Sequence, residues 1–389
     1  MWNKRRWTRL GAALLCAGLM PGQTMQVFAK SPEFARTAEE WETLRDDRLD
    51  YNEIPDLVHE YNNTVIQNQI AYRDERDQDR DDVAQDYYDR ANEIYNNLEY
   101  PDTDDASYGS RMAAALSSEQ QAQSLMEQGD ESVEDSETIK LGYDKTEAEL
   151  VKQAQSLMIT YWSQYYSLDT SRSAVSQAEA SYQTAQNRLA AGMNTQSDVL
   201  TAKEAVSNAE ASLLSAESSF NTTKENLCQM LGWSYGAQVE IGELPEPDGE
   251  AIAAIDLQAD IARALENSYS YQITAKQLAN ARTASGKEKL AQTQKNQKEA
   301  ISNDVGDKYQ SLTLAKSSYD QAVQAYELEQ ASLASAERKL AAGTITQKAY
   351  SEQQAACGNA RVAVQTKKLA LLQAQVDYDW AVNGLASVS

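Results

Sequence analysis

The octapeptide LAAGMNTQ at residues 189–196 returns 151 residues later as LAAGTITQ at residues 340–347. Beyond each octapeptide the chain runs a similar distance to a further glycine, 40 residues from Gly192 to Gly232 and 41 residues from Gly343 to Gly384. At the same offset of 151, Ala205, Asn208 and Ala209 correspond to Ala356, Asn359 and Ala360. A shared turn, shared flanks and arms of equal length together indicate an internal duplication.

Apolar residues around each octapeptide follow the alternating 3- and 4-residue spacing of a coiled coil. After the first turn the repeating positions are Ala202, Val206, Ala209, Leu213, Ala216 and Phe220, and before the second they are Leu312, Ala315, Tyr319, Ala322 and Tyr326. No proline lies between Pro101 and Pro245 or after Pro247, so long helices are not interrupted. We therefore predict an all-α fold of elongated antiparallel coiled-coil hairpins in two internal repeats.

The duplication divides the chain. The first repeat is predicted over residues 48–232 and the second over residues 254–389, with a linker rich in glycine and proline at 233–253. The two repeats also begin alike, since residues 54–63 resemble residues 257–267. Within the first repeat, residues 102–149 hold 13 acidic and 3 basic side chains, and we expect this segment to be weakly helical or partly disordered.

Residues 1–29 have the pattern of a signal peptide. Four basic residues precede an apolar stretch at residues 10–20, which is shorter than the roughly 20 residues needed to span a bilayer. Cleavage is expected after Ala29, followed by a polar lead-in at residues 30–47. Cys16 is only a weak lipoprotein signal because Leu15 before it is bulky. The protein is therefore expected to be exported to the extracytoplasmic cell envelope.

Composition and motifs argue against several classes of function. The formal net charge of −24 disfavours binding to nucleic acid or to an anionic membrane surface. The mean hydropathy of −0.63 is that of a soluble chain, and no later segment is a transmembrane candidate. There is no phosphate-binding loop, no metal-ligand spacing and a single histidine, His59, interpreted as a surface or interface residue. We predict neither an enzyme nor a cofactor.

Cys228 and Cys357 are predicted not to form a disulfide within one chain. They lie 36 and 14 residues from their respective hairpin turns. That offset is about 33 Å along a helix axis, whereas the Cα atoms of a disulfide lie within about 7 Å of each other.

The region from Tyr182 to Gly232 resembles the second half of a repeat of the TolC-type outer-membrane efflux family. The matching features are an alanine-rich helix, the turn at Gly192, the segment Ser197-Asp198-Val199-Leu200 and the ending Leu231-Gly232. The resemblance implies a homotrimer forming a helical tube outside the cytoplasm. Its hairpin tips would dock a periplasmic-type adaptor and an ABC or other efflux transporter. By position, the tip residues are Gly192, Met193, Asn194, Thr195, Asp198, Gly343, Thr344, Ile345 and Thr346.

The chain departs from that family in two respects. Close to the place where the first copy carries Asp198, the second copy carries Lys348. Residues 97–145 and 281–306, where the family inserts the strands of a membrane β-barrel, show no alternating strand pattern. An alternative is therefore an exported coiled-coil structural or interaction protein without transport activity. A periplasmic adaptor also uses a helical hairpin, but it needs β-rich domains for which the sequence offers no clear strands.

Overall fold

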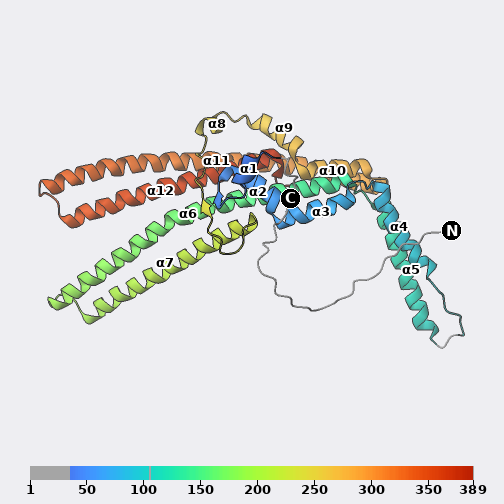
Figure 1. Cartoon of the computed structure of the whole chain (residues 1–389), viewed down its shortest axis with the longest axis horizontal. Helices are drawn as coiled ribbons and strands as arrows, with labels where there is room; N and C mark the ends of the chain where they lie inside the picture. Colours follow the sequence, from blue (N-terminus) through green and yellow to red (C-terminus); the bar gives the residue numbers. More distant parts are fainter. Residues whose placement is uncertain (1–35, 105–106, 389) are drawn as a thin grey trace.

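Two long helical hairpins dominate the chain. The computed structural model describes residues 36–104 and 107–388, and Figure 1 shows that nearly all of its regular structure is helical. One hairpin joins α6 (Ser136–Ala190) to α7 (Gln196–Met230), and the other joins α11 (Ala284–Ala341) to α12 (Gln347–Trp380). Because α6 contacts α12, the long helices lie in the order α7, α6, α12, α11. The prediction of an all-α fold of elongated antiparallel hairpins is confirmed.

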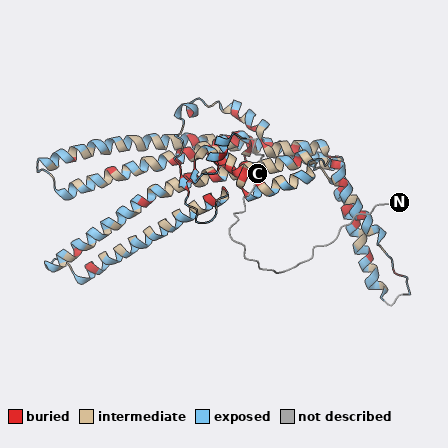
Figure 2. Cartoon of the chain, viewed as in Figure 1, coloured by how far each residue is buried: buried red, intermediate tan, exposed pale blue. Residues whose placement is uncertain are grey.

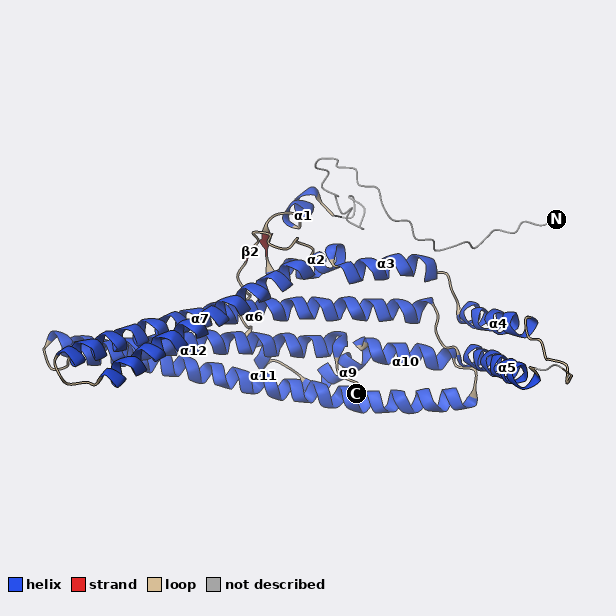
Figure 3. Ribbon diagram, turned by 90° about the horizontal axis from the view of Figure 1, so that it is seen from below, coloured by secondary structure: helices blue, strands red, loops and turns tan. Residues whose placement is uncertain are grey.

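Short helices complete the row beside each long helix. With 35 residues, α7 covers only part of the 55-residue α6, and the remainder packs against α2 (Ile54–Tyr61) and α3 (Asn63–Glu75). Likewise α12 covers part of the 58-residue α11, and α9 (Leu257–Asn267) and α10 (Tyr269–Asn280) cover the rest. Figure 3 shows these pairs continuing the lines of α7 and α12. The two halves are therefore built alike.

An asparagine closes the joint within each row. In the first half, the Asn62 side-chain amide donates to the Met230 carbonyl at 2.9 Å, and its Oδ1 accepts from the Thr64 N–H to begin α3. In the second half, the Asn267 amide donates to the Val382 carbonyl at 3.2 Å. Helix ends carry carbonyls without an intrahelical partner, so each asparagine satisfies one where two helices meet.

The buried core lies around these joints (Figure 2). The joint of the first half buries Ile54, Leu57, Met158, Leu227 and Leu231, and that of the second half buries Ala264, Ile301, Val305, Leu312 and Leu371. A smaller cluster of Ile159, Leu369, Leu372 and Val376 holds α6 against α12. Away from this region most residues of the hairpin arms are exposed or half-buried, as expected for helices that stand in pairs.

The acidic segment 102–149 is more regularly helical than the sequence analysis predicts. Over its described residues it forms α5 (Tyr108–Glu131) and the beginning of α6, and α5 packs against α4 (Arg80–Asn96). The contact is made by small buried residues such as Ala91 and Ala122. The buried Arg80 guanidinium donates to the carbonyls of Gly129, Asp130 and Ser132 at the end of α5. Capping and close packing of small side chains therefore order a strongly acidic segment.

The lead-in and the linker also contain regular structure. Within the polar lead-in, α1 (Ala38–Thr43) buries Trp41, with the guanidinium groups of Arg36 and Arg45 lying over its ring. Strand β1 (Arg48–Leu49) pairs in parallel with β2 (Glu240–Ile241) from the linker. A 3-10 turn (Tyr51–Glu53), α8 (Gly249–Ala253) and a π-type turn (Ala381–Leu385) complete the described elements. Both segments thus pack onto the body.

The predicted signal peptide at residues 1–29 and Cys16 lie outside the described residues. Across the ranges 36–104 and 107–388, no helix combines the length and the apolar character that a bilayer span requires.

Candidate docking tips

The first tip is the turn between α6 and α7. The Gly192 N–H donates to the Leu189 carbonyl at 2.9 Å, and the Met193 N–H donates to the Arg188 carbonyl at 2.8 Å. These bonds close the last turn of α6, and they place Gly192 at a φ of +73°. That left-handed conformation costs glycine little, because it has no Cβ. The sequence prediction of a glycine turn at this residue is confirmed.

Asp198 is exposed at the first tip, where hydrogen bonds to Thr195 hold its carboxylate. Its carboxylate accepts from the Thr195 N–H at 2.7 Å and from the Thr195 hydroxyl at 2.9 Å, while the Thr195 Oγ1 accepts from the Asp198 N–H. This reciprocal capping box begins α7. The hydrogen bond from the Thr195 main chain, followed by that from its hydroxyl, lowers the pKa of Asp198. The tip therefore carries a fixed negative charge at a helix N-terminus, where charge of that sign is favourable.

The second tip repeats this backbone with a different charge. Gly343 has a φ of +68°, and the Thr344 N–H donates to the Lys339 carbonyl at 2.9 Å. Thr346 begins α12, since its Oγ1 accepts from the Ala349 N–H. The position equivalent to Asp198 is Ala349, and the exposed Lys348 before it forms an ion pair with Glu352 at 3.7 Å. The two tips are therefore alike in backbone, but only the first carries a carboxylate in its helix cap.

The structure brings the predicted tip residues to one end of the molecule in two separate groups. Figure 1 shows both turns at the left end, and the two hairpins diverge towards it from the contact between α6 and α12. In the first tip the Met193 side chain is 71% exposed, whereas Ile345 in the second is half-buried. Each tip therefore presents a small surface of its own.

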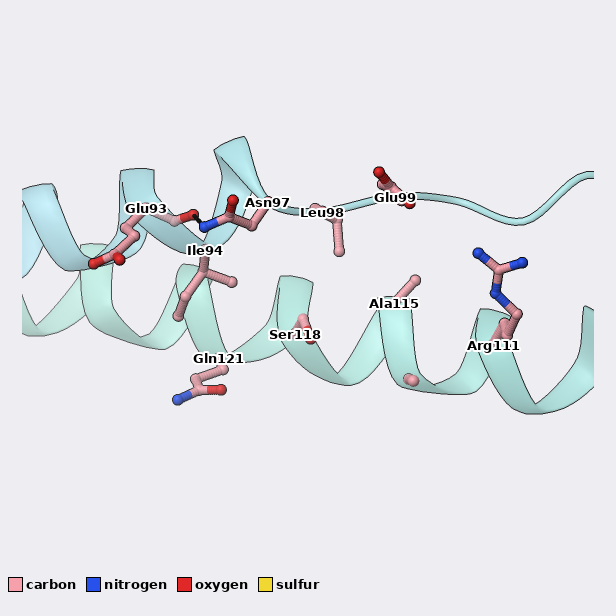
Figure 4. A pocket seen from close by; sticks show the side chains of 10 residues that line it. Glu93, Ile94, Asn97, Leu98, Glu99, Arg111, Ala115, Ser118 and Gln121 are labelled. Atoms are coloured by element: carbon pink, nitrogen blue, oxygen red, sulfur yellow. Dashed lines mark hydrogen bonds between the residues drawn. The ribbon is translucent and has the colours of Figure 1, made fainter.

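The α4–α5 end of the chain offers an open groove of about 510 Å³ (Figure 4). Its lining includes Glu93 and Glu99 from one side and Arg111 and Ser118 from the other. The side-chain amide of Asn97 donates to the Glu93 carbonyl at 2.9 Å. The mixture of charges and small polar groups does not resemble the largely apolar enclosed pocket of a small-molecule site.

The histidine and the two cysteines considered in the sequence analysis pack between helices of the fold. His59 lies between α2 and α6, where its Nδ1 is 2.9 Å from the Glu147 carboxylate. Cys228 and Cys357 are buried and unpaired, as predicted. Within the part of the chain that the structure describes, no group of three or more His, Cys, Asp and Glu side chains is arranged to hold a metal ion.

The sequence interpretation overlooked a set of exposed leucines along the outer helices α7 and α11. They are Leu200, Leu214, Leu314 and Leu328. The sequence contains a pattern that could have identified them. In each helix the two leucines are 14 residues apart, on a face that the heptad seam does not use.

Solved structures with a similar arrangement include outer-membrane proteins. The outer membrane protein VceC from Vibrio cholerae matches over 90% of this chain and 99% of its own, with a TM-score of 0.50 and 12% identity. The outer-membrane channel OprN matches over 95% of this chain and 99% of its own, with a TM-score of 0.52 and 10% identity. The chain has the TolC-type fold. A membrane protein from Pseudomonas aeruginosa is similar too, with a TM-score of 0.51 and 13% identity over 86% of this chain and 90% of its own.

Neither a protein-family profile nor a curated protein sequence matches the chain. The TolC-type fold is thus recognised from the three-dimensional arrangement.

Proposed function

We propose that the chain is a TolC-like component of an export system. Copies of it form a helical conduit outside the cytoplasm, which docks an adaptor and a transporter through the hairpin tips. The single observation that carries the proposal is that both tips lie at one end of a chain with the TolC-type fold (Figure 1). A conduit needs all of its tips at one end, because only then does one ring of partners meet every tip.

The exposure of the arms supports assembly with other chains. A helix whose apolar residues all face its own partner needs no further contact, but large apolar side chains on the outer helices remain in water here. Contact between copies would remove these side chains from water, which the hydrophobic effect favours. The two repeats, which we propose to be copies of one unit, supply two such hairpins per chain.

The tips support docking because they are rigidly built and chemically distinct from the arms. Capping by Thr195 and Thr346 fixes where the descending helices begin, and main-chain bonds fix where the ascending helices end. Between them, Met193 offers an apolar side chain that makes little contact with its own chain. A partner can bury it without disturbing the hairpin.

Export assays in the native host test the proposal. The gene is deleted and replaced by the wild type, by Met193→Glu or by Met126→Glu, a methionine exposed at the opposite end on α5. Cellular accumulation of ethidium and release of secreted peptides are measured. We expect the deletion to raise accumulation or reduce release, and we expect Met126→Glu but not Met193→Glu to restore the wild-type level. Unchanged export in the deletion strain would instead favour a structural or interaction protein.

A further inference from the structure

A cavity of about 210 Å³ lies in the body of the chain, where α2 and α3 pack along α6. On α3 it is lined by Val65 and by the residues three, four and seven positions later, and on α6 by Lys140 and by the residues three, four and seven positions later. This spacing places each set on one face of its helix. His59 of α2 lines the cavity as well. Two facing helical surfaces and one imidazole therefore bound a partly enclosed space.

Apolar atoms form most of the cavity surface. The rings of Tyr72 from α3 and Tyr143 from α6 meet edge to face, with their centroids 6.4 Å apart and an angle of 82° between their planes. The Tyr143 hydroxyl donates to the Glu75 carboxylate at 2.9 Å, which helps to hold that ring in place. The face of a tyrosine ring attracts cations as well as apolar groups. The cavity therefore suits a ligand with an apolar part.

The charged groups of the cavity are predominantly acidic. The Lys140 Nζ lies 3.2 Å from the Asp144 carboxylate, and the His59 Nδ1 lies 2.9 Å from the Glu147 carboxylate. When His59 is neutral, two carboxylates and one ammonium line the cavity, which leaves one negative charge in excess. A cation is therefore attracted into the cavity and an anion is repelled.

The second repeat carries lysines where the cavity has its carboxylates. At the offset of 151 that relates the two turns, Asp144 and Glu147 correspond to Lys295 and Lys298. In that half α10 still packs along α11. Two carboxylates are thus not needed to hold a short helix against a long one. A role in binding accounts for their place beside the tyrosines of the first repeat.

We propose that the cavity binds a small organic ammonium ion, with its charge beside Asp144 and Glu147 and its apolar part against Tyr72 and Tyr143. An apolar cavity of about 150 Å³ holds a benzene molecule, so this cavity has room for one ring with a short cationic substituent. Aromatic faces recognise quaternary ammonium groups, and the carboxylates add the attraction of opposite charge. The cavity lies in the body and not at the tips, so the inference does not depend on the proposed function.

The proton on His59 competes with such a ligand for Glu147. The hydrogen bond to Glu147 raises the pKa of His59 against the effect of burial, with Glu60 acting in the same direction as Glu147 and Arg36 in the opposite one. The other titratable groups around the cavity are Tyr72, Lys140, Tyr143 and Asp144, with Tyr269 on α10. Ligand affinity should therefore rise as the pH passes upward through the pKa of His59, and a bound ligand should in turn lower that pKa.

Isothermal titration calorimetry on the purified protein tests the class of ligand. The probes are benzyltrimethylammonium, benzyl alcohol as an uncharged ring and benzoate as an anionic ring. We expect saturable binding of one benzyltrimethylammonium per chain, binding of benzyl alcohol weaker by about tenfold or more, and no binding of benzoate. Equal affinity for benzyl alcohol would show that charge plays no part, and the absence of saturable binding would show that there is no site. Either result overturns the proposal.

Three variants locate the site. Glu147→Gln should weaken the binding of benzyltrimethylammonium about tenfold and Tyr72→Leu about fivefold. Glu149→Gln is the matched control, because it makes the same change on α6 at an exposed residue outside the cavity, and its affinity should equal that of the wild type. Equal losses in Glu147→Gln and Glu149→Gln would place the ligand elsewhere. Circular dichroism checks that each variant is folded, and the comparison of probes needs the wild type alone.

The single histidine of the chain provides a readout that a purely structural role would not change. With a purification tag that contains no histidine, proton NMR follows the ring of His59 during a pH titration. We expect saturating benzyltrimethylammonium to lower the pKa of His59, and we expect the affinity to depend on pH in the wild type but not in His59→Gln. An unchanged pKa in the presence of bound ligand would contradict the proposed site.

Discussion

Replacing Gly232 by alanine tests the joint at which α7 meets α2. Gly232 lies two residues after the end of α7 at Met230, and its φ of +95° lies in the region that L-residues rarely adopt. A Cβ added there would lie 2.4 Å from the Cβ of Tyr61. The Tyr61 atom belongs to the stem of its side chain, so a change of rotamer does not remove the clash. The backbone of α2 or of the turn has to move.

The size of the effect follows from two contributions. Holding an L-residue in the left-handed region costs about 1–2 kcal/mol. Forcing an extra carbon into a packed site costs about 1–3 kcal/mol. We therefore expect Gly232→Ala to lower the free energy of unfolding by about 2–5 kcal/mol. Gly236→Ala is the matched control, because Gly236 has a φ of +79° but no atom within 4 Å of an added Cβ. Gly236→Ala should therefore lower the free energy of unfolding only by the cost of the left-handed conformation.

Urea unfolding followed by far-UV circular dichroism measures both variants against the wild type. Tryptophan fluorescence adds a local probe, since Trp233 is the next residue and packs against the first-half core. The urea concentration at the unfolding midpoint should be highest for the wild type, lower for Gly236→Ala and lowest for Gly232→Ala. If Gly232→Ala unfolds at the same urea concentration as Gly236→Ala, the close contact with Tyr61 is absent and the joint is wrongly described.

Two further predictions concern the tip and the body. Thr195→Ala removes the cap of α7 and should destabilise its first turn by about 1 kcal/mol, seen as faster amide hydrogen exchange there; an unchanged exchange rate would show that the capping box is not formed. In the body, the hydrogen bond to Glu147 raises the pKa of His59. The stabilisation from this pair should be complete below a pH of about 6.5, the pKa of histidine in the unfolded chain, and it should decline as the pH rises through the higher pKa of His59 in the folded chain. The midpoint of urea unfolding should therefore fall over this range in the wild type and be flatter in His59→Gln.

The hairpins were predictable because their signals are local and repeated. The seam from Ala202 to Phe220 has a three-four spacing that only a helix places on one face. The turns at Gly192 and Gly343 share flanking residues as well as the glycine. The exposed leucines were overlooked for another reason, because single exposed leucines are common and attract no notice alone.

The α4–α5 pair could not be recognised because most of its buried residues are small. Ala91, Ala115 and Ala122 do not stand out from the exposed alanines around them, and the acidic residues suggested disorder. The pairing of β1 with β2 could not be predicted from the sequence for a different reason. Each strand has two residues, and Arg48 and its partner Glu240 are 192 positions apart, so no local pattern links them.

The most direct test of the central claim is a pair of distances between spin labels. One protein carries nitroxides at Met193→Cys and Thr344→Cys in the two tips, and another carries them at Met193→Cys and Leu116→Cys on α5. Cys228 and Cys357 are buried and should not react with the label. The fold predicts a tip-to-tip distance well below the length of α6, about 82 Å for its 55 residues, and a longer tip-to-α5 distance. A tip-to-tip distance as long as α6 would place the two turns at opposite ends and contradict the account.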